Sequence, residues 1–226
     1  RPMSTFTDRL VAACETEHKR FLKKGGGHGK EFDEGDGLSP NYSRIVGEYW
    51  KSIKINLEGK TRDAKGRRPP WSAAFISFVV RKAEAGDTFK YAQAHQTYIR
   101  QAILAAEDGT TGTAYVARRV SDRAPQLGDL LAKGRESAKN FTYDKALAKA
   151  RKTKADEQGY SSHCDVVTKV DRAAKTVTTI GGNLGDSVME KVWKTDKDGK
   201  LLPYKEKNSA GVVTEFPWIA VLECRI

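Results

Sequence analysis

An apolar run at residues 73–80 constrains the fold of this chain more than any other feature. The run, Ala-Ala-Phe-Ile-Ser-Phe-Val-Val, follows Pro69, Pro70, Trp71 and Ser72. A helix that is apolar almost all round is buried, because it has no polar face to present to water. We therefore expect a central, covered helix with Ser72 at or next to its N-terminus, since proline is favoured in or just before a first helical turn.

The spacing of apolar residues predicts helices in the first half of the chain and strands in the second. Helices are expected at residues 7–23, from the turn at 39–41 onward, and at 91–106; strands are expected at 127–132, 163–170, 176–180, 187–193 and 219–224. Helices followed by strands indicate an α+β domain, with N-terminal helices packed on an antiparallel sheet. We expect residues 1–40 to form a helix with a Gly-rich, acidic loop, and residues 41–226 to form one domain with a Lys-rich insertion at about 136–160.

The net charge of +11, from 40 Lys and Arg against 29 Asp and Glu, favours an anionic partner such as a nucleic acid, a membrane surface or a cell-wall polymer. The densest basic stretches, residues 60–68 and 145–154, contain no aromatic residue, which disfavours nucleic acid. No run is long enough for a membrane span, and the first residues lack the apolar core of a secretory signal. We expect no membrane span and leave the localisation open.

Ser72 is the candidate nucleophile, because a helix start offers unpaired N–H groups and a partial positive charge to a developing oxyanion. A serine hydroxyl also needs a base within hydrogen-bond reach. The alternative is an ordinary helix cap. The three cysteines and four histidines lack metal-ligand spacing, so we expect neither a metal nor a disulfide framework.

His163 is the candidate base. Side chains alternate along a strand, so His163 and Asp165 share one face while Cys164 points to the other, as a core residue. A hairpin centred on Ala173 would pair position 163 with Asn183, whose carboxamide would orient the histidine. The alternatives are a structural histidine and a glycine-rich turn in which Asn183 bonds its own backbone.

Five further residues are candidates for the cleft or for substrate binding. They are Trp71, His95, Asp129, Arg135 and Asp165. His95 would line the cleft or replace His163, Asp129 would add a carboxylate or belong to a turn, and Arg135 would bind a substrate carboxylate.

Four segments in this order resemble the CHAP and NlpC-type superfamily of papain-like amidases and peptidases, and more closely an uncharacterised bacterial branch of it. They are residues 71–77, 127–130, 163–167 and 181–183 with Val188, within a resemblance that covers about 45–224. In that superfamily a cysteine begins the helix, so the resemblance places Ser72 at the nucleophile position, His163 as base and Asn183 as orienter. It implies a papain-like fold, cleavage of peptidoglycan amide bonds, and no cofactor.

The expected function is therefore a peptidoglycan amide hydrolase, an amidase or endopeptidase of phage-lysin or antibacterial-effector type, with a Ser-His-Asn triad. Such an enzyme acts in the periplasm or at the wall of a target bacterium, and an effector has an immunity protein as a further partner. Because serine replaces cysteine, the residue is a natural nucleophile, an engineered inactivation or a degenerate site. The alternatives are an inactive wall-binding or nucleic-acid-binding module on the same fold, and an acyltransferase.

Overall fold

The computed structural model describes residues 5–152 and 159–226. Its helices are α1 (Phe6–Phe21), α2 (Tyr42–Ser52), α3 (Ser72–Lys82), η1 (Gly86–Thr88), α4 (His95–Asp108), η2 (Glu136–Ala138) and α5 (Tyr143–Lys152). Its strands are β1 (Tyr115–Arg118), β2 (Leu130–Gly134), β3 (Ser162–Asp171), β4 (Thr176–Gly181), β5 (Met189–Lys194), β6 (Tyr204–Lys207), β7 (Val213–Phe216) and β8 (Trp218–Cys224). The expected insertion at 136–160 contains η2 and α5, and its residues 153–158 lie outside the described part of the chain.

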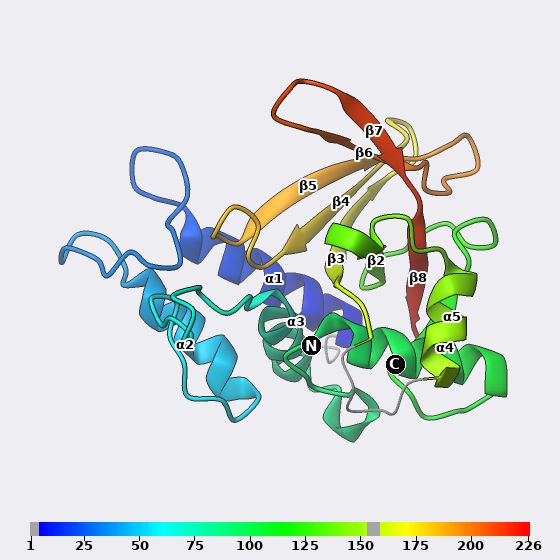
Figure 1. Ribbon diagram of the computed structural model, residues 1–226, viewed down its shortest axis with the longest axis horizontal. Coiled ribbons are helices and arrows are strands. Elements are labelled where there is room, and N and C mark those ends of the chain that lie inside the picture. The colour runs from blue at the N-terminus through cyan, green and yellow to red at the C-terminus, as the bar shows by residue number, and fades with distance from the viewer. Residues whose placement is uncertain (1–4, 153–158) are drawn as a thin grey trace.

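Six strands form one sheet in the order β1-β8-β2-β3-β4-β5, and every neighbouring pair is antiparallel. Strands β6 and β7 form a separate hairpin that projects from the sheet on the side away from the helices (Figure 1). The expected α+β architecture, with helices packed on an antiparallel sheet, is confirmed.

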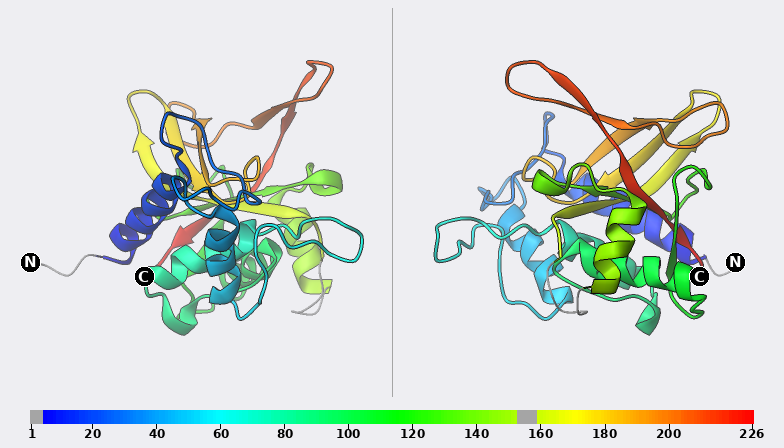
Figure 2. Two further views of the ribbon diagram at one scale, coloured as in Figure 1. Left: turned by 90° about the vertical axis from the view of Figure 1, so that its left-hand side faces the viewer. Right: turned by 45° about the vertical axis from the view of Figure 1, so that its right-hand side comes forward.

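Helix α3 lies on the helical side of the sheet, where it packs against α1, α2 and strand β3 (Figures 1 and 2). Every residue from Ser72 to Val80 is buried, as the apolar run predicts. Phe75 and Ile76 are fully inaccessible and belong to the main core, together with Cys164 and Val166 of β3. The first turn of α3 is therefore fixed by packing on several sides.

Helix α1 packs into the same core. Leu10, Cys14 and Phe21 have no exposed surface. Tyr49 of α2 donates a hydrogen bond from its hydroxyl to Glu17 Oε2 at 2.7 Å, and the Arg20 guanidinium donates to Glu48 Oε2 of α2 at 2.8 Å. These contacts tie α1 to α2 through buried and half-buried polar groups.

The main departures from the predicted elements are short strands and one late helix start. Strands β1, β6 and β7 have four residues each, too few for a periodicity signal. Helix α4 begins at His95 rather than near residue 91, because Ser77 Oγ bonds both the N–H and the carbonyl of Ala92, at 3.0 and 3.1 Å. That clamp keeps the approach to α4 extended, with Ala94 at φ −130° and ψ 128°.

Of the helices in residues 5–152 and 159–226, none combines the length and the apolar character needed to cross a membrane.

Candidate active site

Ser72 is the first helical residue of α3, and its side chain bonds to another helix. Its Oγ lies 2.7 Å from Nε2 of His95, the first residue of α4. Trp71 occupies the N-cap position, but its side chain makes no capping hydrogen bond to the helix, and no acidic residue lies in the first turn. The helix-cap alternative for Ser72 is therefore wrong, and the N–H groups of the first turn of α3 have no side-chain cap.

His95 is held by contacts to both ring nitrogens. The backbone N–H of Cys164, which lies beyond the last β3–β4 pair, donates to Nδ1 at 3.2 Å, and the Tyr98 hydroxyl bonds the same atom. A backbone N–H can only donate, so Nδ1 is an acceptor and the neutral ring carries its hydrogen on Nε2. Burial first, and then His163 and Arg135, hold the pKa of His95 well below its ordinary value, so the ring is neutral. In the resting site His95 thus donates to Ser72 Oγ.

His163 lies beside His95 and is paired with a carboxylate. The two rings are 4.9 Å apart between centroids, and His163 Nε2 lies 2.7 Å from Asp165 Oδ1. Burial opposes the charge of Asp165, but His163 and Lys133 hold the pKa of that carboxyl below its ordinary value. Burial lowers the pKa of His163, against the opposing effect of Asp165. The Asp165 carboxylate therefore accepts from Nε2, and Nδ1 of His163 has no partner among the described residues.

The structure does not bring His163 into hydrogen-bond contact with Ser72. The predicted alternation along β3 is confirmed, since Cys164 belongs to the main core while Val167 belongs to a second cluster with Leu131. His163 shares the face of Val167; its ring neighbours that of His95, but it is not part of the pocket that Ser72 and His95 line. The site therefore uses the candidate that was expected to line the cleft or replace His163.

Asn183 does not orient His163. The β3–β4 ladder ends at the pair Val166 and Ile180, so positions 163 and 183 are unpaired. Asn183 follows β4 with φ 56°, and its side chain makes no hydrogen bond among the described residues. Asp165 takes the place next to His163 that the sequence interpretation gave to Asn183. The turn of the alternative interpretation is present, but the bond from the Asn183 side chain to its own backbone is not among the hydrogen bonds of the described residues.

Trp71 and Asp129 are structural. The Trp71 ring is 1% exposed, stacks on Phe21 at 6.0 Å between centroids, and donates from Nε1 to the buried carboxylate of Glu31. Asp129 precedes β2 and accepts hydrogen bonds from the backbone N–H groups of residues 126 and 224, both at 2.9 Å. Neither side chain faces the Ser72 site, and the turn alternative for Asp129 is correct.

A pocket of about 420 Å³ opens onto Ser72 and His95. Arg135, Gln93 and Ser162 form parts of its wall, whereas His163 does not reach it. Arg135 thus lies at the pocket, and its binding of a substrate carboxylate stays a prediction. Among the described residues, no group of three or more His, Cys, Asp or Glu side chains is arranged to hold a metal ion.

Two partners of His95 were not among the sequence candidates. Tyr98 lies three positions after His95, a spacing that places both on one face of a helix, so the sequence carried a signal for it. The Cys164 N–H carried none, because only the tertiary fold brings that strand end to α4.

Comparison with family models matches residues 43–224 to a family described as an uncharacterised protein conserved in bacteria, DUF2272. No curated protein and no solved structure matches the chain.

Proposed function

We propose that this chain, which belongs to the bacterial DUF2272 family, is a serine-dependent hydrolase of amide bonds in bacterial peptidoglycan. One observation carries the proposal: Ser72 Oγ, in the first turn of a buried helix, is hydrogen-bonded to His95 Nε2 at 2.7 Å on the wall of a pocket. A hydroxyl, a histidine and uncapped N–H groups together are the parts that acyl transfer requires. The papain-like relationship is part of this proposal and rests on the order of the motifs.

In the proposed reaction Ser72 Oγ attacks the amide carbonyl carbon while its proton passes to His95 Nε2. That step requires the opposite tautomer from the resting one: the hydrogen moves to Nδ1, where Tyr98 Oη would accept it, and the Cys164 N–H gives up Nδ1 as its acceptor. The imidazolium then gives the Nε2 proton to the leaving amine as the C–N bond breaks. Water hydrolyses the resulting Ser72 ester by the same proton transfers in reverse, which regenerates the hydroxyl.

The developing oxyanion would be bound by backbone N–H groups at the start of α3. No acidic residue lies in that turn and no side chain caps it, so these donors remain available to a substrate oxygen. Removal of one such donor in other hydrolases costs about 10²- to 10³-fold in kcat, which makes this term comparable to the base itself.

The choice of peptidoglycan rests on charge and on the motif resemblance. A net charge of +11 favours approach to an anionic wall polymer, and Arg135 supplies a cation at the pocket.

The buried pair of His163 and Asp165 would act beside His95, where it would exclude water from the His95 ring and help to hold that ring in place.

The test is release of soluble fragments from purified peptidoglycan by wild type, Ser72→Ala and Ser72→Cys. Ser43→Ala is a matched control, because Ser43 is a buried serine of α2 whose hydroxyl is also hydrogen-bonded. We expect Ser72→Ala to lose turnover and Ser43→Ala to keep it. Equal turnover by wild type and Ser72→Ala would refute the serine mechanism, and activity only in Ser72→Cys would show that serine inactivates a thiol enzyme.

A second candidate, an inactive wall-binding module, is favoured by the Cys164 N–H bond to His95 Nδ1. That bond stabilises the tautomer in which His95 donates to Ser72 and cannot accept its proton. Retained binding to peptidoglycan without fragment release by wild type and by Ser72→Cys would support this candidate.

A further inference from the structure

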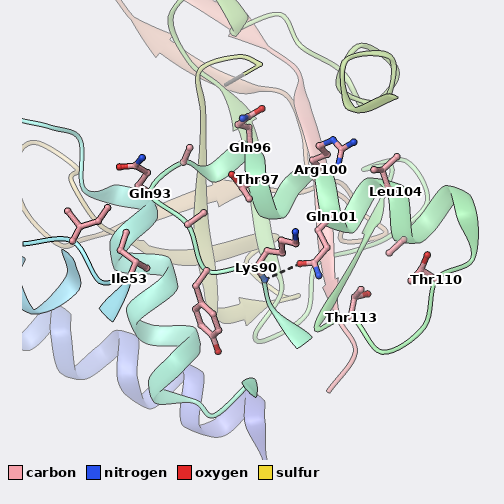
Figure 3. Close-up of a pocket in the computed structure, with 15 residues that line it drawn as sticks. Ile53, Lys90, Gln93, Gln96, Thr97, Arg100, Gln101, Leu104, Thr110 and Thr113 are labelled. Atoms are coloured by element: carbon pink, nitrogen blue, oxygen red, sulfur yellow. Dashed lines mark hydrogen bonds between the residues drawn. The ribbon is translucent and has the colours of Figure 1, made fainter. Parts of the chain in front are cut away.

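A second pocket adjoins the Ser72 pocket along α4. Its volume is about 770 Å³, and it shares Gln93, Ala94 and Gln96 with the wall of the Ser72 pocket. Figure 3 shows Gln96, Arg100 and Leu104 projecting from successive turns of α4 along this pocket. The two pockets therefore share part of their walls, with Ser72 on one and Arg100 on the other.

The charged residues that line the second pocket in the described part of the chain are both cations. Lys90 and Arg100 reach it, and no Asp or Glu of residues 5–152 and 159–226 does. Amides and hydroxyls supply most of the remaining polar wall, and Ile53 and Leu104 supply apolar surface. This composition suits an elongated polar ligand with a negative charge, because a bound anion would meet two cations and, among the described lining residues, no carboxylate.

Arg100 is half-buried and partly fixed. Its Nε donates to the carbonyl of Ala150 at 2.9 Å, which anchors the guanidinium, and it has no carboxylate partner among the described residues. By contrast, the half-buried Arg123 pairs with Asp129 at 3.2 Å and with Glu223 at 3.0 Å. An anchored guanidinium that keeps donors toward a pocket is suited to binding a carboxylate.

We propose that this pocket is a subsite for a free carboxylate of the peptide whose amide bond reaches Ser72, with Arg100 as its main ligand and Lys90 as a second cation. This inference rests on the proposed function. Arg100 lies four residues beyond Gln96, about 6 Å along the helix axis. An extended peptide covers that length in about two residues, so the recognised carboxylate lies about two residues beyond the shared wall at Gln96.

The test measures binding without turnover, in the full chain carrying Ser72→Ala. The probes are a synthetic wall stem tetrapeptide with a free C-terminal carboxylate and the same peptide with a C-terminal amide, titrated by calorimetry. We expect the free acid to bind about tenfold more tightly than the amide. Adding Arg100→Gln should reduce that preference to about twofold or less, whereas Arg44→Gln, at an exposed arginine outside the pocket, should leave it unchanged.

A further variant guards against misfolding, because Arg100 also bonds the backbone of α5. Arg100→Lys keeps the charge and loses the planar fork, so it should retain part of the preference. Equal affinity for acid and amide, no binding of the free acid at millimolar concentration, or full preference in a folded Arg100→Gln variant would overturn the subsite. If the wild-type protein releases no fragments from peptidoglycan but the acid is still bound more tightly than the amide, the hydrolase proposal would be overturned and the subsite would stand.

Discussion

Replacing Tyr98 with phenylalanine tests whether the proposed reaction depends on the His95 tautomer that carries its hydrogen on Nδ1. For His95 to accept the Ser72 proton, its ring must carry hydrogen on Nδ1, and Tyr98 Oη is the side-chain acceptor in contact with that atom. The Cys164 N–H, also at Nδ1, cannot accept. Tyr98→Phe therefore removes the acceptor on which the reactive tautomer depends.

The expected loss in kcat follows from the burial of this group. His95 and Tyr98 are 4% and 1% exposed, so the ring N–H would find no water in place of the hydroxyl. A buried donor without a partner costs about 1 to 3 kcal/mol. At about 1.4 kcal/mol for each factor of ten, kcat should fall about 10- to 100-fold.

The assay is the rate of fragment release from peptidoglycan, with Tyr115→Phe as the matched control. Tyr115 is also buried in the core, and its hydroxyl makes one hydrogen bond, to the Gly128 carbonyl at 3.1 Å. Both variants lose one buried hydrogen bond, so they should lose similar stability, but only Tyr98→Phe should slow the reaction. Wild-type kcat in Tyr98→Phe, with His95→Gln inactive, would refute the tautomer step. Nitrogen NMR of the His95 ring reports the resting tautomer directly.

Three further predictions concern stability, each measured by urea denaturation. Arg68→Ala should lower the free energy of unfolding by about 3 kcal/mol, because it leaves the buried Glu31 carboxylate without its cation. The neighbouring Arg67→Ala removes an exposed ion pair and should cost about 0.5 kcal/mol or less. Equal losses in the two variants would contradict this. Gly182→Ala should cost about 2 kcal/mol or more, since its Cβ would lie 2.5 Å from a core side-chain atom, and an unchanged midpoint would exclude that clash. Burial holds the pKa of His95 well below 6.5, so as the pH falls the unfolded chain binds a proton at this histidine before the folded chain does. The free energy of unfolding should therefore fall below about pH 6.5, by at most about 1.4 kcal/mol per pH unit per proton. His95→Gln should show a shallower fall, and parallel curves for the two proteins would contradict the lowered pKa of His95.

Local patterns were sufficient for the elements that frame the site. The unbroken apolar run predicted that α3 is buried, and the alternation along β3 predicted that Cys164 points into the core. The turn before α2 was also recognised, and Asn41 caps that helix through its side chain, which accepts from the Arg44 N–H at 2.9 Å. Each of these features depends on neighbours within one turn or one strand.

The partner of Ser72 could not be predicted in the same way. Residues 72 and 95 meet because the starts of two helices converge, and that depends on the Ser77 clamp on Ala92. The pairing of position 163 with Asn183 failed for a related reason. The predicted register holds at Val166 and Ile180, beyond a bulge in β3, but the ladder ends there. Hydrophobic period specifies a register without specifying where pairing stops.

The packing of helix α1 determines how far the chain can be shortened from its N-terminal side. The family match begins at residue 43, inside α2, and leaves α1 outside it. Yet α1 contacts α3, β3 and β4, and Leu10 and Phe21 are completely buried there. A piece trimmed to the matched segment would expose an apolar face and tend to aggregate. The cooperative folding unit thus extends beyond the family boundary, and a relative without an equivalent of α1 must cover that face with another segment or another chain.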